Sequence, residues 1–223
     1  IFQATDLEVS IRTSCKAKID QTGESVLPGK LLTDVVRSLP EAAVTIDTST
    51  LNTASITCGQ SSFSLKTLSA EDYPRFPEVD AEQTVSLPSE TFAHVVHQVS
   101  RSVSRDETRP ILTGILVVVE SGTLRMVATD SYRLCVREVA LPDVSNEIEL
   151  VVPGKAMEDV AKLIGSSDKV SLGVSENQVI FTFGDTTFVS RRIEGAFPNY
   201  RQLLPKEHTT RAVVDRTEFL EAV

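Results

Sequence analysis

The amino-acid sequence predicts an α+β protein in which each domain is a duplicated unit of one strand, one helix and three strands. The first observation behind this prediction is a repeat of about 125 residues, in which Ala4-Thr5-Asp6 returns as Ala128-Thr129-Asp130. That period is longer than the roughly 20 to 50 residues of a solenoid repeat and has the size of a whole domain. The second observation is that strand-like and helix-like segments follow each other in the same order twice within one period.

Further landmarks keep the same register along the chain. They are Leu27-Pro28-Gly29-Lys30, which returns as Val152-Pro153-Gly154-Lys155, Gly59-Gln60-Ser61-Ser62-Phe63, which returns as Gly184-Asp185-Thr186-Thr187-Phe188, and Tyr73-Pro74, which returns as Phe197-Pro198. Near the end, Arg216-Thr217-Glu218-Phe219 resembles Pro88-Ser89-Glu90-Thr91-Phe92. The repeat therefore predicts the C-terminal part of one domain at 1–82, a complete second domain at 83–208, and the start of a third at 209–223.

The first half of the complete domain begins with the alternating segment 84–87, which predicts a short strand. Pro88-Ser89-Glu90 predicts a helix start with Ser89 as the N-cap, and the helix is expected to run to about Ser104. Its apolar residues recur at spacings of three and four and so form one face: Phe92, Val95, Val96, Val99 and Val103. Runs rich in β-branched residues then predict three strands at 112–119, 123–129 and 133–140.

The second half repeats this order. Segment 148–152 predicts a strand, and 153–164 predicts a helix that begins at Pro153-Gly154-Lys155. Strands are expected at 170–174, 178–183 and 187–193. Two helices per domain should therefore cover a body of sheets.

The predicted helices carry basic residues on a face separate from the apolar one. Pairs seven residues apart project from the same side, because seven residues make two turns. The cations in this arrangement are Lys30 with Arg37, Lys155 with Lys162, and the series His97, Arg101 and Arg105 at spacings of four. A single such helix is ordinarily a solvated amphipathic helix. Recurrence of the pattern in several helices indicates a shared cationic surface, which would suit duplex DNA phosphates without base-specific contacts.

Composition limits the function classes. The formal net charge of −9 argues against general affinity for nucleic acid, although the location of basic residues matters more than their sum. No apolar run approaches the length of a membrane span, so no membrane partner is expected. Cys15, Cys58 and Cys135 are far apart and form no CxxC pair, which predicts buried thiols in a reducing cytoplasm.

Enzymatic interpretations find little support. The sequence contains neither a phosphate-binding GxxxxGK[ST] loop nor a GxGxxG motif after a strand. His94 and His97 could share a metal, but no second pair of ligands accompanies them, so no metal, cofactor or catalytic residue is predicted. Asp6 and Asp130 recur at a turn, which favours hydrogen bonding to turn amides over acid–base catalysis. A duplicated enzyme domain with a site at a domain junction stays open as an alternative, as does a peptide-binding adaptor that never encircles DNA.

Two segments carry a resemblance to a known family: Val127-Ala128-Thr129-Asp130-Ser131-Tyr132-Arg133-Leu134 and Phe197-Pro198-Asn199-Tyr200-Arg201-Gln202-Leu203-Leu204-Pro205. Together with the paired Pro-Gly-Lys helix starts, they resemble the bacterial β sliding clamps, the processivity factors of DNA polymerase III. The resemblance covers essentially the whole chain. It implies a DNA clamp fold, in which three such domains per chain and two chains per homodimer form a ring with helices inside and sheets outside.

The resemblance also implies a function and a set of partners. The ring encircles duplex DNA and tethers the replicative DNA polymerase, a separate clamp loader opens it, and other proteins with clamp-binding motifs dock on it in the cytoplasm. The cations Lys30, Arg37, Arg101, Arg105, Lys155 and Lys162 would face the DNA. Phe63 aligns with a residue of the ring junction, although a plain core or strand role is equally open. Part of domain one and nearly all of domain three are expected to lie outside this chain, which alone would not close a ring.

In the family, client peptides dock into a hydrophobic pocket of domain two that domain three extends. Carried onto this sequence, the pocket residues are Leu112, Thr129, Ser131, Tyr132, Arg133, Leu134, Pro198, Gln202 and Leu203. The leucines and the proline would supply apolar walls, while Arg133 and the Thr129 hydroxyl would orient a bound backbone or carboxylate. Where the second copy has Ser131-Tyr132-Arg133, the first has Leu7-Glu8-Val9, so the second copy is expected to have an additional role.

Overall fold

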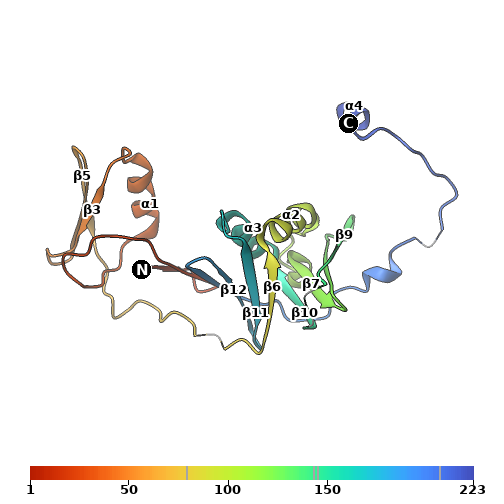
Figure 1. The fold of residues 1–223 in the computed structure, drawn as a ribbon, viewed down its shortest axis with the longest axis horizontal. Helices are drawn as coiled ribbons and strands as arrows, with labels where there is room; N and C mark the ends of the chain where they lie inside the picture. Colours follow the sequence, from red (N-terminus) through yellow and green to blue (C-terminus); the bar gives the residue numbers. More distant parts are fainter. Residues whose placement is uncertain (79, 143, 145, 206) are drawn as a thin grey trace.

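A computed structural model describes residues 1–78, 80–142, 144, 146–205 and 207–223 (Figure 1). The first part of the chain contains β1 (Phe2–Thr5), β2 (Val9–Thr13), α1 (Gly29–Ser38), β3 (Val44–Asp47), β4 (Thr53–Cys58) and β5 (Ser61–Lys66). Strands β3, β4 and β5 form a three-stranded antiparallel sheet, and β1 and β2 form a hairpin. In Figure 1, α1 lies on the side of this sheet that faces the rest of the chain from β6 onward, called the central domain below.

The central domain contains two successive units with the predicted order. The first consists of β6 (Gln83–Pro88), α2 (Ser89–Val99), β7 (Gly114–Glu120), β8 (Thr123–Thr129) and β9 (Leu134–Ala140). The second consists of β10 (Ile148–Pro153), α3 (Gly154–Leu163), β11 (Lys169–Val174), β12 (Gln178–Phe183) and β13 (Thr186–Arg191). This order confirms the prediction of a duplicated strand, helix and three-strand unit.

The two units exchange their first strands. Strand β6 pairs with β11 of the second unit, and β10 pairs with β7 of the first, both antiparallel. The resulting sheets have the orders β10-β7-β8-β9 and β1-β2-β13-β12-β11-β6. Because β2 pairs with β13, the hairpin of the first part extends a sheet of the central domain and joins the two parts by backbone hydrogen bonds.

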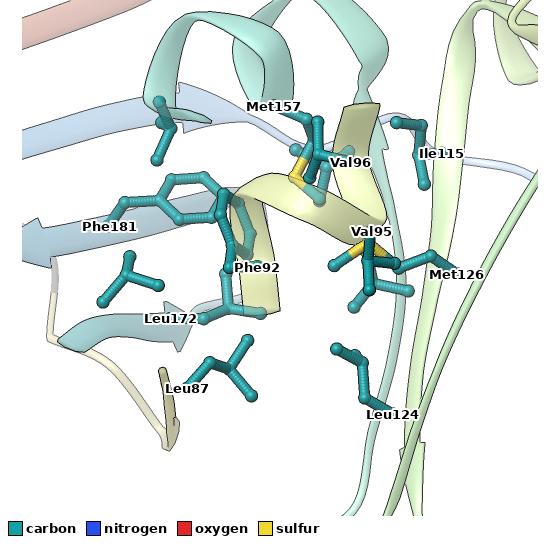
Figure 2. Close-up of a cluster of buried hydrophobic side chains, with 14 of the residues drawn as sticks. Leu87, Phe92, Val95, Val96, Ile115, Leu124, Met126, Met157, Leu172 and Phe181 are labelled. Carbon is teal, nitrogen blue, oxygen red and sulfur yellow. The ribbon is translucent and has the colours of Figure 1, made fainter. Parts of the chain in front are cut away.

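The core lies between the two sheets, where α2 and α3 pack against each other. Phe92 of α2 is fully buried, and its ring centroid lies 5.9 Å from that of Phe181 on β12. Figure 2 shows Phe92, Val95 and Val96 of α2 within the same cluster as Met157 of α3 and Ile115 of β7. The apolar stripe predicted for this helix is therefore the face that packs in the core.

The start of α3 explains one glycine in the repeated Pro-Gly-Lys motif. A Cβ on Gly154 would lie 2.9 Å from Val103 Cγ1 and 3.2 Å from the Thr113 carbonyl oxygen, which is too close for an unshifted side chain. A Cβ on the equivalent Gly29 would have nothing within 4 Å. The glycine of the second copy is thus required by packing, whereas that of the first is not.

Several predicted boundaries were wrong. Helix α2 ends at Val99 and is followed by the 3₁₀ turn η1 (Ser100–Ser102), so it does not reach Ser104. Pro88 occupies the N-cap position, and Ser89 is the first helical residue, with a buried hydroxyl that has no hydrogen-bond partner among the described residues. Strand β7 begins at Gly114 because Pro110–Thr113 forms the 3₁₀ turn η2, for which proline at the first position is well suited.

The cysteines also correct a prediction. Cys58 is buried and Cys135 is half-buried, but Cys15 is exposed because it lies beyond the end of β2 in a segment without regular structure.

Toward the C-terminus, η3 (Tyr200–Gln202) follows β13. Helix α4 (Arg216–Ala222) is preceded by its N-cap Asp215, whose side chain accepts hydrogen bonds from the N–H groups of Thr217 and Glu218. In the part of the chain that the structure describes, no helix has the length and apolar character needed to cross a membrane.

Candidate functional site

The turn between β8 and β9 is closed by side-chain hydrogen bonds. Asp130 Oδ1 accepts bonds of 3.0 Å from the backbone N–H groups of Tyr132 and Arg133, and Asp130 Oδ2 accepts one of 3.0 Å from Arg133 Nε. These bonds lower the pKa of the Asp130 carboxyl, and the bond from the Arg133 backbone has the largest effect. Thr129 Oγ1 donates to the Arg133 carbonyl oxygen at 2.8 Å. The prediction that Asp130 binds turn amides is confirmed.

The equivalent turn of the first copy has the same backbone and different side chains. Asp6 Oδ1 accepts hydrogen bonds from the N–H groups of Glu8 and Val9, at 3.1 and 2.8 Å. Leu7 has φ of 76° and its counterpart Ser131 has φ of 79°, so both turns hold a non-glycine residue in the left-handed region. The fold therefore imposes this conformation, and only the side chains distinguish the two copies.

An apolar patch covers the face of the four-stranded sheet opposite to the helices. Alternate residues of β7 point to opposite faces, so Ile115 and Val117 enter the main core while Leu116 and Val118 lie on the other side. Tyr200 packs there, together with Leu134 and Phe197. The segment after β13 thus folds back across the sheet and meets the strand that follows the β8–β9 turn. Of the predicted pocket residues, Leu134 belongs to this cluster, and Pro198 follows its member Phe197 in sequence.

The predicted pocket residues differ in exposure. Leu112 and Thr129 are buried, at 6% and 4% exposed, so the Leu112 side chain presents little surface of its own. Leu134 and Pro198 are half-buried. Exposed members are Ser131, Tyr132, Arg133, Gln202 and Leu203. Tyr132 is 96% exposed and Leu203 is 62% exposed, so both are accessible to a partner.

A groove of about 1590 Å³ lies on the helix side of the central domain. The predicted DNA-facing residues that line it are Arg101, Arg105, Lys155 and Lys162. Both repeat-related turns also line it, the first with Glu8 and the second with Asp130, Tyr132 and Arg133. Lys30 and Arg37 are exposed on α1, outside this groove.

The groove contains acids as well as bases, and several of them are paired. Arg133 binds Asp130, Arg109 binds Asp106 at 2.8 Å, and Lys162 lies 3.7 Å from Asp159. Among the described residues, no carboxylate lies within ion-pair distance of Arg101, Arg105 or Lys155. These three cations have no close ion pair, although Glu8, Glu107 and Glu158 also line the groove.

The spacing of four between His97, Arg101 and Arg105 predicts one face of a long helix, and this prediction is wrong. Only His97 belongs to α2, whereas Arg101 lies in η1 and Arg105 in the following loop. Ser102 and Ser104 are buried between these cations, which keeps Arg101 and Arg105 on the exposed side. Their shared location thus depends on the loop and not on helical periodicity.

Two arginines near the pocket were missed by sequence reasoning. Arg109 Nη1 donates a 2.9 Å hydrogen bond to Ser131 Oγ, across 22 residues of sequence. Arg125 on β8 binds Glu138, the main cause of its raised pKa, and Tyr200 contributes to the same shift. For Arg109 a weak signal existed, since it continues the spacing of four beyond Arg105.

Phe63 lies in β5, which is a terminal strand of its three-stranded sheet. It alternates with exposed serines and so lies on the half-buried face of the strand, with Leu65.

Within the described ranges, no group of three or more His, Cys, Asp or Glu side chains is arranged to hold a metal ion.

Family models match two parts of the chain. The model for the DNA polymerase III beta subunit, N-terminal domain, matches residues 1–77, and that for the central domain matches residues 86–199. The beta sliding clamp of Staphylococcus aureus is 32% identical over 232 aligned residues, covering 100% of this chain and 62% of that protein. The beta sliding clamp of Streptomyces coelicolor is 37% identical, covering 98% of this chain and 59% of that protein. The chain thus spans about three fifths of the length of these curated relatives.

Solved structures give the same result. The DNA polymerase sliding clamp of Bacillus subtilis matches with a TM-score of 0.87 and 30% identity, over 99% of this chain and 60% of that one. The sliding clamp of Pseudomonas aeruginosa, solved bound to griselimycin, matches with a TM-score of 0.88 and 30% identity over the same shares. The clamp fold expected from the sequence is confirmed, and the chain belongs to the family of DNA polymerase III beta subunits, the beta sliding clamps.

Proposed function

We propose that this chain is the greater part of a sliding clamp that encircles duplex DNA and tethers the replicative DNA polymerase. The observation that carries the proposal is the helix-side groove, in which Arg101, Arg105, Lys155 and Lys162 meet in a protein of net charge −9. Exposed cations attract phosphates over the Debye length of about 8 to 10 Å without reading bases. Such contacts hold the duplex loosely, which sliding requires. Lys30 and Arg37 of α1 would extend this surface into the first domain.

The proposed docking site for clients lies at the edge of the apolar patch, whose central members Leu116, Val118 and Tyr200 are themselves buried. Leu134 and Pro198 provide apolar walls at its edge, while Gln202 and Leu203 come from η3 and the residue after it. Arg133 and Ser131 on the adjoining turn offer donors to a bound peptide backbone. Griselimycin, which is bound to the Pseudomonas aeruginosa clamp, is proposed to bind here as well. Client classes are the polymerase, the clamp loader and other proteins with clamp-binding motifs.

Assembly is proposed to follow from sheet edges. Strand β2 of the first part already pairs with β13 of the central domain, and the equivalent strand in the central domain is β9. We propose that β9 pairs with a third domain that begins in 209–223, after domains at 1–82 and 83–208. Strand β5, with Phe63, would pair across the ring junction of a homodimer. The proposed protein is non-catalytic, needs no cofactor and acts in the cytoplasm.

The test is a primer-extension assay with the whole clamp protein, its loader and its polymerase. Charge reversal in Lys155→Glu/Lys162→Glu is expected to shorten the products at physiological salt, because two groove cations are replaced by anions. Product lengths equal to those of the unmodified clamp would contradict encirclement through this groove and would favour a peptide-binding adaptor. Retained griselimycin binding by the same variant shows that the fold is intact.

A further inference from the structure

The turn places Ser131 in the left-handed region, where the identity of its side chain is the feature to be explained. A serine in the left-handed region costs free energy that glycine would not. Its counterpart Leu7 has the same backbone and a side chain without a hydrogen-bonding group. In the second copy, by contrast, Ser131 Oγ accepts the bond from Arg109 Nη1. Leu7 has no hydroxyl with which to make the equivalent bond, so this contact distinguishes the second turn from the first.

Arg109 is itself held in place before it reaches Ser131. Its Nε donates to Asp106 Oδ2 at 2.8 Å, and Asp106 Oδ1 accepts bonds from the N–H and hydroxyl groups of Thr108, at 3.0 and 2.6 Å. The Asp106 N–H in turn binds the hydroxyl of Ser104, which is buried. A continuous series of hydrogen bonds, which starts at the buried Ser104, therefore fixes the Arg109 guanidinium.

This series of hydrogen bonds ends at the proposed client pocket. Ser131 donates its N–H to Thr129 Oγ1 at 3.2 Å, and Thr129 binds the carbonyl of Arg133. Arg133 is 63% exposed at its side chain and remains directed by Asp130. A change at Arg109 therefore reaches three of the predicted pocket residues through hydrogen bonds, without Arg109 being one of them.

We infer that Arg109 is a positioning residue of the client pocket, which it orders by anchoring the Ser131 hydroxyl. This inference rests on the proposed function, because it assumes that ligands bind beside the β8–β9 turn. Anchoring the turn before binding lowers the conformational entropy that a ligand must remove. The loop 103–109 also lines the cationic groove, as do Asp130, Tyr132 and Arg133 of the turn.

The experiment is calorimetric titration of the whole clamp protein with griselimycin. Arg109→Met and Ser131→Gly are each expected to weaken binding roughly fivefold, as expected for one partly exposed charge-assisted hydrogen bond. Arg109→Met/Ser131→Gly is expected to lose no more than either single variant, since both remove the same bond. Ser131→Asn, which tolerates a positive φ and keeps an acceptor, should restore affinity to within about twofold. Arg137→Met, on the opposite face of β9, is the matched arginine control and should bind normally.

A purely structural role of this hydrogen bond would make stability and affinity fall together. Under the inference, the two properties separate in Ser131→Gly. The glycine relieves backbone strain, so the melting temperature of this variant is expected to rise while its affinity for griselimycin falls. Equal or tighter binding by Ser131→Gly, or additive losses in the double variant, would overturn the inference. Leu134→Glu separates this outcome from failure of the pocket itself. If it abolishes binding while Arg109→Met does not change it, the pocket stands and the anchor is wrong. If Leu134→Glu binds normally, or the unmodified whole protein does not bind, both proposals fail.

Discussion

Removing two lysines from the groove gives a quantitative test of how this chain contacts DNA. The change is Lys155→Gln/Lys162→Gln, which takes the formal net charge from −9 to −11. The two side chains are exposed and seven residues apart on α3, about 10 Å along the helix axis. They are therefore expected to meet different phosphates of a duplex. Neither side chain contributes to the core, so the fold should persist.

The expected magnitude follows from counterion release. Each phosphate that a cation neutralises contributes about 0.9 to the slope of log K against log salt concentration. Lys155 has no ion pair among the described residues, so its full contribution should disappear. Lys162 is partly compensated by Asp159 at 3.7 Å, so it should contribute less. The slope is therefore expected to fall by an amount between about 0.9, for Lys155 alone, and about 1.8, for both lysines.

The assay is fluorescence anisotropy of a labelled duplex titrated with the chain at several salt concentrations. The matched control is Lys66→Gln/Lys169→Gln, which produces the same net charge from lysines outside the groove. This control should lower affinity only slightly and leave the slope nearly unchanged. Equal slopes for the two double variants would refute the assignment of the groove as the DNA-facing surface, because only overall charge would then matter.

Three further predictions concern stability. Phe92→Ala should lower the free energy of unfolding by about 3 to 5 kcal/mol in urea denaturation, since the ring is fully buried against Phe181; a loss below about 1.5 kcal/mol would contradict this packing. Gly154→Ala should cost about 1 to 3 kcal/mol through its contacts with Val103 and Thr113, whereas the repeat-equivalent Gly29→Ala should be neutral or stabilising. The pKa of the Asp130 carboxyl is lower in the folded chain than in the unfolded chain, so its contribution to stability is fully present above the unfolded pKa and is lost as the pH falls through the lower folded pKa. Asp130→Asn should therefore show a smaller decline in melting temperature between about pH 5 and pH 2 than the unmodified chain, and an equal decline would argue against this pKa shift.

Much of the fold was accessible from local patterns. The apolar spacing of Phe92, Val95 and Val96 identified the buried face of α2, because each helical position has a fixed direction relative to its neighbours. Strands β8 and β12 have the predicted bounds, since turn residues flank them on both sides. Predictions failed at the ends of elements, as at Val99, where a 3₁₀ turn replaces the expected α-helix. Whether a helix continues there depends on the burial of Ser102 and Ser104, which is a tertiary property.

The candidate site shows the same division. The Asp130 turn was predicted correctly because its hydrogen bonds span only two or three residues. The contact between Arg109 and Ser131 joins two loops, and the packing of Tyr200 beside Leu134 joins the end of the domain to its middle. Arg101 and Arg105 line one groove with Lys155 and Lys162, but η1 and the following loop, and not a long helix, direct them there.

The repeat, its element order and its family are encoded in the order of residues along the chain, because periodicity and short motifs depend only on near neighbours. The exchange of β6 and β10 between the two units, the union of β2 with β13, and the groove shared by α2, α3 and two distant turns arise only in the folded molecule. Strand pairing and the meeting of charged loops depend on which distant surfaces bury each other, and no local pattern specifies that choice.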